Sequence, residues 1–86
     1  MLVSVIIPAL NESDNIVDCI QAARRRYPDD AVEIIVVDGG STDNTPALIP
    51  ADVRVVNSER GRAVQMNRGA AHARGDILLF CHADTR

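Results

Sequence analysis

Lysine and tryptophan are absent from this sequence, and only one tyrosine and one phenylalanine occur among its 86 residues. Nine arginines supply every fixed cationic side chain, yet the formal net charge is -3. Domains that bind nucleic acid combine a basic stripe with aromatic platforms on which bases stack. The sequence has neither feature, so we expect no nucleic-acid partner.

Long apolar runs are also missing. No stretch approaches the roughly 20 apolar residues that a membrane span requires, and the mostly apolar segment 2–10 lacks a basic start and is interrupted by Pro8. We therefore predict a cytoplasmic chain, with membrane association only through a C-terminal part beyond these residues. The two cysteines, Cys19 and Cys81, have no C-x-x-C spacing, and we expect both to be buried thiols of a reducing compartment.

The apolar residues that are present form four short runs, which we interpret as strands. The run Ile34–Val37 is continuous rather than alternating, which is typical of a strand buried on both faces. The same interpretation applies to the segment 76–81. The other two predicted strands are 2–7, which ends at Pro8, and 53–56.

Between the strands, two segments carry a helical period and a third is shorter. Apolar residues recur along one face of the first helix, at Ile16, Cys19, Ile20, Ala23 and Tyr27. A stripe of small or apolar residues in segment 61–73 is suited to lying on a sheet, and it comprises Ala63, Met66, Ala70 and Ala73. A short helix is predicted in between, with Thr45 as its cap and Pro46 at its first position.

Strands that alternate with helices predict an α/β fold with a parallel sheet and right-handed crossovers. We expect four strands and about three flanking helices in one domain, or in a piece of one, spanning residues 1–86. Ligands of such sheets bind beyond the carboxyl ends of the strands. Three polar clusters follow strands, at 8–12, 38–43 and 82–84, and we expect them to share one edge of the sheet.

The two common nucleotide-binding loops are absent from the first turn. That turn reads P-A-L-N-E-S-D and has no glycine, so it cannot be the G-x-G-x-x-G of a dinucleotide fold or the glycine-rich loop of a nucleoside triphosphatase. Two strand ends carry carboxylates instead, Asp38 and Asp84. At a shared edge these would repel each other unless a cation lay between them, and Mg²⁺ or Mn²⁺ holding a diphosphate fits that requirement.

Three segments now occur in order: S-V-I-I-P-A-L-N-E, I-I-V-V-D-G-G-S-T-D-N-T and G-R-A-V-Q-M-N-R-G-A-A-H-A-R-G-D-I-L-L-F-C-H-A-D-T. Together they resemble the N-terminal, nucleotide-sugar-binding half of family 2 glycosyltransferases, over nearly all 86 residues. The resemblance implies a Rossmann-like sheet of the GT-A type. It also implies a UDP- or GDP-sugar donor, a divalent metal (Mn²⁺ or Mg²⁺) on the diphosphate, and inverting transfer to an acceptor hydroxyl.

The same resemblance implies that residues 1–86 form only the donor half of the domain. The acceptor-binding half would lie beyond Arg86, together with the general base. No catalytic residue is therefore assigned within the chain, the acceptor is unknown, and the chain alone is expected to be inactive.

The resemblance assigns binding roles residue by residue. The family's P-x-x-N-E turn matches Pro8, Asn11 and Glu12 and would lie against the nucleoside, although capping of the first helix would also explain Glu12. Asp38 is expected near the base. The family often has a second aspartate directly after it, where this chain has Gly39.

The family's D-x-D metal motif appears here as H-A-D. Asp84 is the predicted metal ligand, and His82 is a second candidate that could instead contact the nucleotide or be a plain surface histidine. Arg62 either reaches the diphosphate or is solvated, and Asn67 either contacts the sugar or ties down a loop. The complete predicted nucleotide-sugar site is Pro8, Ala9, Leu10, Asn11, Glu12, Asp38, Gly39, Arg62, Asn67, His82, Ala83 and Asp84.

Simple structural roles are predicted for other polar residues. Ser41, Thr42 and Asp43 are interpreted as turn and capping residues, and His72 as a surface histidine. Two further functions remain beside the glycosyltransferase. One is a binding module that holds a nucleotide or nucleotide sugar without catalysis. The other is a nucleotidyltransferase, which is disfavoured because A-L-N-E lacks the glycine- and arginine-rich loop that holds a triphosphate.

Overall fold

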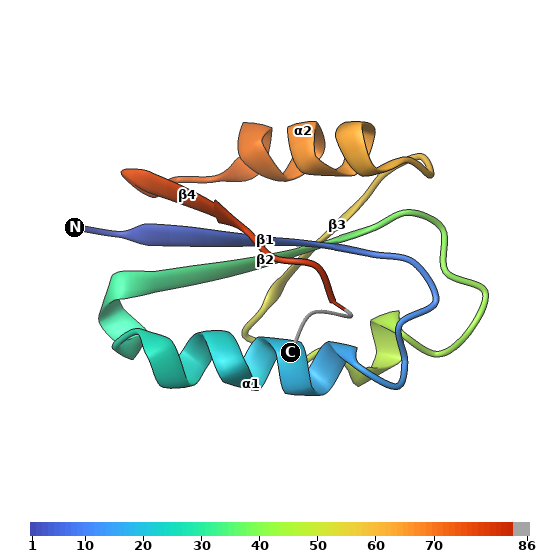
Figure 1. Cartoon of the computed structure of the whole chain (residues 1–86), viewed down its shortest axis with the longest axis horizontal. Helices are drawn as coiled ribbons and strands as arrows, with labels where there is room; N and C mark the ends of the chain where they lie inside the picture. Colours follow the sequence, from blue (N-terminus) through green and yellow to red (C-terminus); the bar gives the residue numbers. More distant parts are fainter. Residues whose placement is uncertain (84–86) are drawn as a thin grey trace.

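The computed structural model describes residues 1–83 and shows a four-stranded parallel sheet (Figure 1). Its strands are β1 (Val3–Ala9), β2 (Val32–Asp38), β3 (Arg54–Asn57) and β4 (Ile77–Phe80). Their order across the sheet is β3-β2-β1-β4. The expected α/β fold with a parallel sheet is confirmed.

Two α-helices cover opposite faces of this sheet, α1 (Ile16–Arg26) below it and α2 (Arg62–His72) above it in Figure 1. The remaining helical segments are single 3₁₀ turns, η1 (Asp29–Ala31) and η2 (Pro46–Leu48). The prediction of about three helices was therefore too high. The middle segment begins at Pro46 as expected, but Pro50 follows so closely that only one turn forms.

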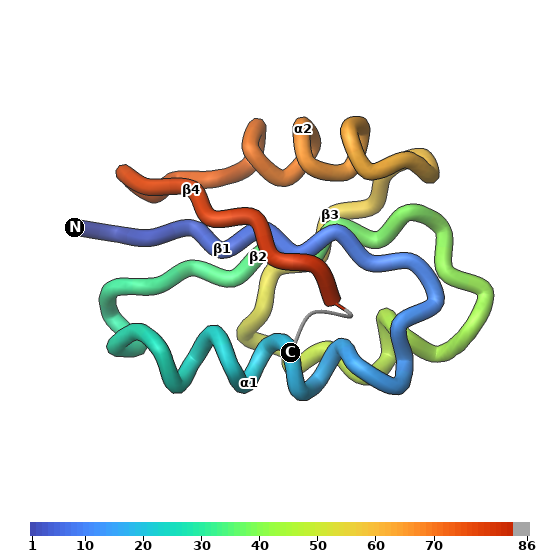
Figure 2. The backbone as a smooth tube through the Cα atoms, in the orientation of Figure 1, coloured from blue at the N-terminus to red at the C-terminus, as the bar shows by residue number. Residues whose placement is uncertain are grey.

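The strand order creates a reversal in the middle of the sheet. The chain steps outward from β1 to β2 to β3, and α2 then carries it back across the sheet to β4 on the other side of β1 (Figure 2). In register, Ala9 of β1 is paired with Asp38 of β2, and Ile6 of β1 with Phe80 of β4. The crevice at such a switch point, beyond the carboxyl ends of the strands, is where ligands of open α/β sheets bind.

The core lies on both faces of the two central strands. On the α1 side, Ile7 and Val36 pack in one cluster with Ile16 and Ile20 of the helix. A smaller cluster on the α2 side consists of Ile6, Ile35 and Val37. Successive side chains of a strand point to opposite faces, so β1 and β2 need the continuous apolar runs that the sequence shows.

Strand β4 does not meet the expectation of burial on both faces. Its four side chains, Ile77 to Phe80, are 37–43 % exposed. The helices pack against β1 and β2 and leave this edge strand uncovered in the part of the chain that is described. The prediction for the cysteines was half right for the same reason, because Cys19 on α1 is buried whereas Cys81, just after β4, is exposed.

The apolar stripe predicted for segment 61–73 is partly confirmed. Ala70 and Ala73 pack against the cluster of Ile6, Ile35 and Val37, whereas Ala63 is exposed. The buried residues of α2 are Gln65 and Gly69. A Cβ atom on Gly69 would lie 2.3 Å from Cγ2 of Ile6 and 3.0 Å from Cγ2 of Val37. Glycine at this position therefore allows the helix backbone to approach the two central strands. Neither α-helix is long and apolar enough to cross a bilayer, as far as residues 1–83 are concerned.

Replacing Gly69 with alanine tests this close approach. In an open helix position the change would stabilise the fold by about 0.5–1 kcal/mol. Here we expect a loss of about 1–3 kcal/mol, because the buried Ile6 side chain has to shift. Chemical denaturation measures the difference, with the exposed neighbour Arg68→Ala as a control expected within about 0.5 kcal/mol of the parent. A Gly69→Ala variant more stable than the parent would contradict the predicted contact.

Candidate functional site

A cavity of about 230 Å³ opens at the carboxyl edge of the sheet, where β1 and β4 end and α2 begins. Chain segments that are far apart in sequence meet there, as the strand order requires. Its lining residues are Pro8, Ala9, Leu10, Glu12, Arg60, Gly61, Arg62, Gln65, His82 and Ala83.

Asn11 ties the loop after β1 to the loop after β2. Its φ of 54° lies in the left-handed region, which asparagine tolerates better than most residues. Its Oδ1 accepts hydrogen bonds from the backbone N–H groups of Thr42 (2.8 Å) and Asp43 (3.2 Å). Its own N–H donates to Oγ of Ser41 at 2.9 Å. Asn11 is therefore exposed yet has a clear structural role, because it holds two of the predicted polar clusters together.

The carboxylate of Asp38 is buried at the end of β2 and arranges the glycine loop that follows. Its Oδ2 accepts hydrogen bonds from the N–H groups of Gly40 (3.2 Å) and Ser41 (3.0 Å). Its Oδ1 accepts a hydrogen bond from the Ser41 hydroxyl. Gly40 has a φ of 97° and faces open space, so its glycine is required by backbone conformation rather than by packing.

A second link between the loops passes through the fully buried Thr45. Its hydroxyl accepts a hydrogen bond from the Glu12 N–H at 2.9 Å and donates one to Oδ1 of Asp43. Asp43 also accepts from the N–H groups of Thr45 (2.9 Å) and Ser13 (3.2 Å). The predicted turn roles of Ser41, Thr42 and Asp43 are thus confirmed, whereas Thr45 makes no side-chain cap on η2.

Gln65 fixes the start of α2 against the ends of the central strands. Its Nε2 donates to the carbonyl oxygens of Ala9 and Val37, both at 3.0 Å. Its Oε1 accepts from the N–H of Gly61 at 3.3 Å. The amide therefore uses both its donors and its acceptor in a position that is only 5 % exposed.

The cavity lining combines positive charge, which suits an anionic ligand group, with further polar side chains. Arg60 and Arg62 flank Gly61 at the start of α2, and Glu12 and His82 lie on the lining as well. The N-terminus of an eleven-residue helix adds partial positive charge and backbone N–H donors. Phosphate groups are the anions that arginine and helix N-termini bind together in proteins.

Comparison with known proteins identifies the family. The sequence model described as "Glycosyl transferase family 2" matches residues 4–86. The chain belongs to this family. A glucosyl-3-phosphoglycerate synthase of Mycolicibacterium paratuberculosis is 35% identical over 92 residues, which cover 95% of the chain and 28% of that protein.

Solved structures of family 2 relatives share the fold. One is the glucosyl-3-phosphoglycerate synthase of Mycobacterium tuberculosis in complex with Mn²⁺, UDP and glucosyl-3-phosphoglycerate, with a TM-score of 0.83 and 32% identity, covering 96% of this chain and 33% of that one. Another is a mannosyltransferase from Pyrobaculum calidifontis in complex with GDP-Man and Mn²⁺, with a TM-score of 0.78 and 34% identity, covering 95% and 27%. This family 2 chain thus spans about a third of the length of these relatives or less.

The predicted family 2 site residues fall into three groups. Seven of them line the cavity: Pro8, Ala9, Leu10, Glu12, Arg62, His82 and Ala83. Asn11 and Gly39 lie in the loops that follow β1 and β2, Asp38 is the last residue of β2, and Asn67 is exposed on α2. Asp84, the predicted metal ligand, lies outside the described residues.

Three residues of the lining were missed from the sequence: Arg60, Gly61 and Gln65. The signal for Gln65 was its spacing, because Gly61, Gln65 and Gly69 recur every four residues and so share one helix face. Two glycines on that face indicate close packing rather than solvent exposure. No sequence pattern that we can name separates Arg60 from the other exposed arginines.

The residues of the site fit a metal held mainly by a substrate. Within residues 1–83, no group of three His, Cys, Asp or Glu side chains gathers to hold an ion. Mg²⁺ and Mn²⁺ commonly use one or two protein carboxylates and complete their shell with phosphates and water. His82 is half-buried on the cavity lining, and its imidazole carries nitrogen atoms of the kind that Mn²⁺ accepts as ligands.

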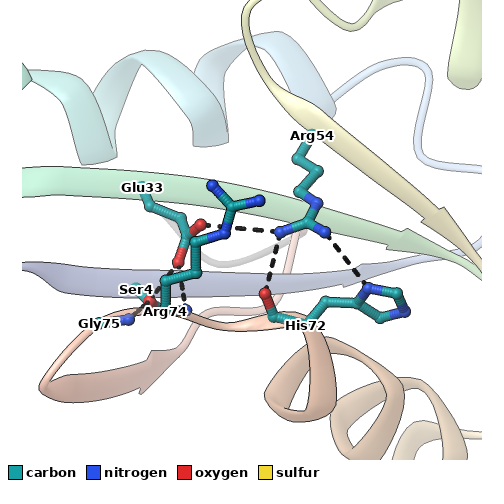
Figure 3. Close-up of polar contacts among 6 residues, drawn as sticks. All are labelled: Ser4, Glu33, Arg54, His72, Arg74 and Gly75. Atoms are coloured by element: carbon teal, nitrogen blue, oxygen red, sulfur yellow. Dashed lines mark hydrogen bonds and ion pairs between the residues drawn. The ribbon is translucent and has the colours of Figure 1, made fainter.

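A larger cavity of about 430 Å³ lies at the amino ends of β2 and β3, and its charges are matched within the protein. Arg24 and Asp52 form an ion pair of 2.8 Å, and Arg54 lies 3.9 Å from Glu33. Arg54 also donates a hydrogen bond to the His72 carbonyl oxygen at 2.9 Å (Figure 3). We assign no ligand to this cavity.

Glu33 anchors this opposite edge (Figure 3). It accepts hydrogen bonds from the Ser4 hydroxyl at 2.6 Å and from the Arg74 N–H at 2.8 Å. Burial alone would raise the pKa of Glu33, but these hydrogen bonds and the charges of Arg54 and Arg74 outweigh it, so that the pKa is lowered. The Gly75 N–H completes the network by donating to Ser4 Oγ at 2.8 Å. The network is therefore a structural link between β1, β2 and the approach to β4.

The acid sensitivity of the loop after β2 can be tested at Asp43. Hydrogen bonds, first the one from the Thr45 hydroxyl and then those from the Thr45 N–H and from Ser13, lower the pKa of Asp43 from 3.8 to about 2 against an opposing effect of desolvation. The stabilisation by Asp43 is therefore complete above the unfolded-state pKa near 3.8 and is lost as the pH falls toward 2. We expect Asp43→Asn to reduce the loss of stability between pH 4 and pH 2, as measured by chemical denaturation at each pH.

The matched variant Thr45→Val keeps the side-chain shape and removes the hydroxyl donor. It should reduce the same pH dependence while leaving the carboxylate in place. An unchanged acid dependence in both variants would show that the hydrogen bonds to Asp43 do not stabilise the folded state.

Proposed function

We propose that the chain binds the nucleoside diphosphate sugar donor of an inverting glycosyltransferase, with UDP- or GDP-sugars as the candidate donors. The observation that carries the proposal is the cavity at the switch point of the sheet, which is lined both by Arg60 and Arg62 near the start of α2 and by the turn that follows Pro8. Relatives of the same family and fold were solved with UDP or GDP-Man and Mn²⁺, which supports a donor of this class.

The base is assigned to the side of Asp38. An ionised aspartate has about four acceptor positions, and three donors, all from Gly40 and Ser41, occupy Asp38 in the structure. The remaining position suits a single N–H of a base, while the loop hydrogen bonds keep the carboxylate in place. Gly39 supplies no side chain, so the contact to the base is assigned to Asp38 alone.

The diphosphate is assigned to the start of α2. Arg62 and the N-terminus of α2 carry the positive charge there. Asp84 and, as a second candidate, His82 would hold Mn²⁺ or Mg²⁺. When bound, the metal would supply positive charge that stabilises the leaving diphosphate.

The proposed enzyme also needs an acceptor site and a general base. We assign neither of them to the described residues. Since the chain spans about a third or less of its relatives' length, we propose that residues 1–86 act as the donor-binding half of a larger domain and are inactive alone. Cytoplasmic localisation, and membrane association only through a further C-terminal part, remain predictions.

Calorimetric titration with UDP and GDP, with and without Mn²⁺, tests the proposal. We expect one nucleotide to bind more tightly with Mn²⁺, and Asp84→Asn to abolish the gain from the metal. The control is Asp52→Asn, which changes an exposed carboxylate at the opposite edge and should leave the affinity unchanged. Undiminished metal-dependent affinity in Asp84→Asn would refute the metal assignment.

A binding module without catalysis is the second candidate. Glu12 accepts a hydrogen bond from Asn15 Nδ2 at 3.2 Å, and Asp38 accepts hydrogen bonds from its own loop. Neither carboxylate is therefore placed as a general base within residues 1–83, which fits a module that only binds and equally fits a donor half whose base lies elsewhere. Nucleotide binding without release of sugar from UDP- or GDP-sugars, even in a longer chain, would favour this alternative.

A further inference from the structure

At the candidate site, the structure leaves no space for a side chain at position 39. A Cβ atom on Gly39 would lie 2.8 Å from Cδ, 2.9 Å from Oε1 and 3.0 Å from Nε2 of Gln65. The φ angle of Gly39 is not in the left-handed region, unlike those of Gly40 and Gly61. The backbone at position 39 therefore accepts an L-residue, and the three nearest heavy atoms that its Cβ would meet all belong to the Gln65 side chain.

The end of a glutamine side chain usually moves aside at little cost, but Gln65 is held in place. Its amide is buried and makes three hydrogen bonds, to Ala9, Val37 and Gly61. Moving it would break these bonds at the point where the ends of β1 and β2 meet α2. Gly39 itself donates its N–H to the Ala9 carbonyl at 2.9 Å, so both residues converge on the same acceptor.

We propose that Gln65 is a positioning residue of the nucleotide site and that residue 39 is glycine because Gln65 occupies the space its side chain would need. Gln65 holds the Gly61 N–H, and Gly61 lies between Arg60 and Arg62 on the cavity lining. Gln65 therefore sets the distance between the two arginines and the wall formed by Pro8 and Ala9. This positioning role rests on the proposed nucleotide function, whereas the coupling of Gly39 to Gln65 does not.

A double-mutant cycle on thermal stability tests the coupling. We expect Gly39→Ala to lower the melting temperature by about 5–10 °C in the parent and by less than about 2 °C in the Gln65→Ala background. As a control, Gly39→Ala combined with Arg68→Ala should show the full loss, because Arg68 is exposed on the same helix. An equal loss in the parent and in the Gln65→Ala background would overturn the coupling.

If Gly39→Ala alone does not fold, the comparison of Gln65→Ala with the double variant still decides the question. Equal melting temperatures support the coupling, and a further large loss in the double variant overturns it. Gln65→Ser provides a second background in which the same two outcomes apply.

Ligand affinity tests the positioning role. In the presence of Mn²⁺, we expect Gln65→Ala to weaken UDP binding about tenfold and uridine binding less than about twofold, because the displaced arginines face the diphosphate. Equal weakening of UDP and uridine would indicate general disruption and would overturn the positioning role. If the parent chain binds no nucleotide, the positioning role fails together with the proposed function, while the stability cycle still decides the coupling.

Discussion

Helix α2 packs against β1 and β2 closely enough that no side chain fits at Gly69, where the helix meets Ile6 and Val37. This close approach brings Gln65, one turn earlier, within hydrogen-bonding distance of the carbonyls of Ala9 and Val37. Gln65 also accepts a hydrogen bond from the Gly61 N–H and so fixes the start of the helix. The position of the arginines at the cavity therefore depends on how two turns of α2 pack against the sheet. A substitution at Gly69 should displace residues at the carboxyl edge of the sheet.

The polar residues of the carboxyl edge divide into those that build the loops and those that face the cavity. Asn11 and Thr45 connect the loops after β1 and β2 through hydrogen bonds to the segment 41–45. Asp38 orders the glycine loop. Glu12, Arg62 and His82 line the cavity itself. Several motif residues that the family resemblance assigns to ligand binding therefore make hydrogen bonds that hold the loops in place.

The parallel sheet and the shared edge of the polar clusters could be predicted, because strand periodicity and the direction of parallel strands fix both. The buried face of α2 could be predicted from apolarity only in part, since Ala70 packs against the sheet as its stripe predicted, whereas Ala63 is exposed and Gln65 is buried. An amide becomes a core residue only when the fold supplies carbonyls for it. The exposure of β4 likewise depends on what covers the strand, which its apolar sequence does not encode. Asp84 lies outside the described residues, so its role stays a prediction.

The location of the nucleotide is tested most directly by NMR mapping of backbone amide shifts during titration with UDP and Mn²⁺. The proposed site predicts the largest changes around Gly39 to Ser41, at Gly61 and Arg62, and around His82, with little change at the opposite edge near Asp52 and Arg54. Saturable changes confined to that opposite edge would contradict the proposed location of the site at the carboxyl ends of the strands.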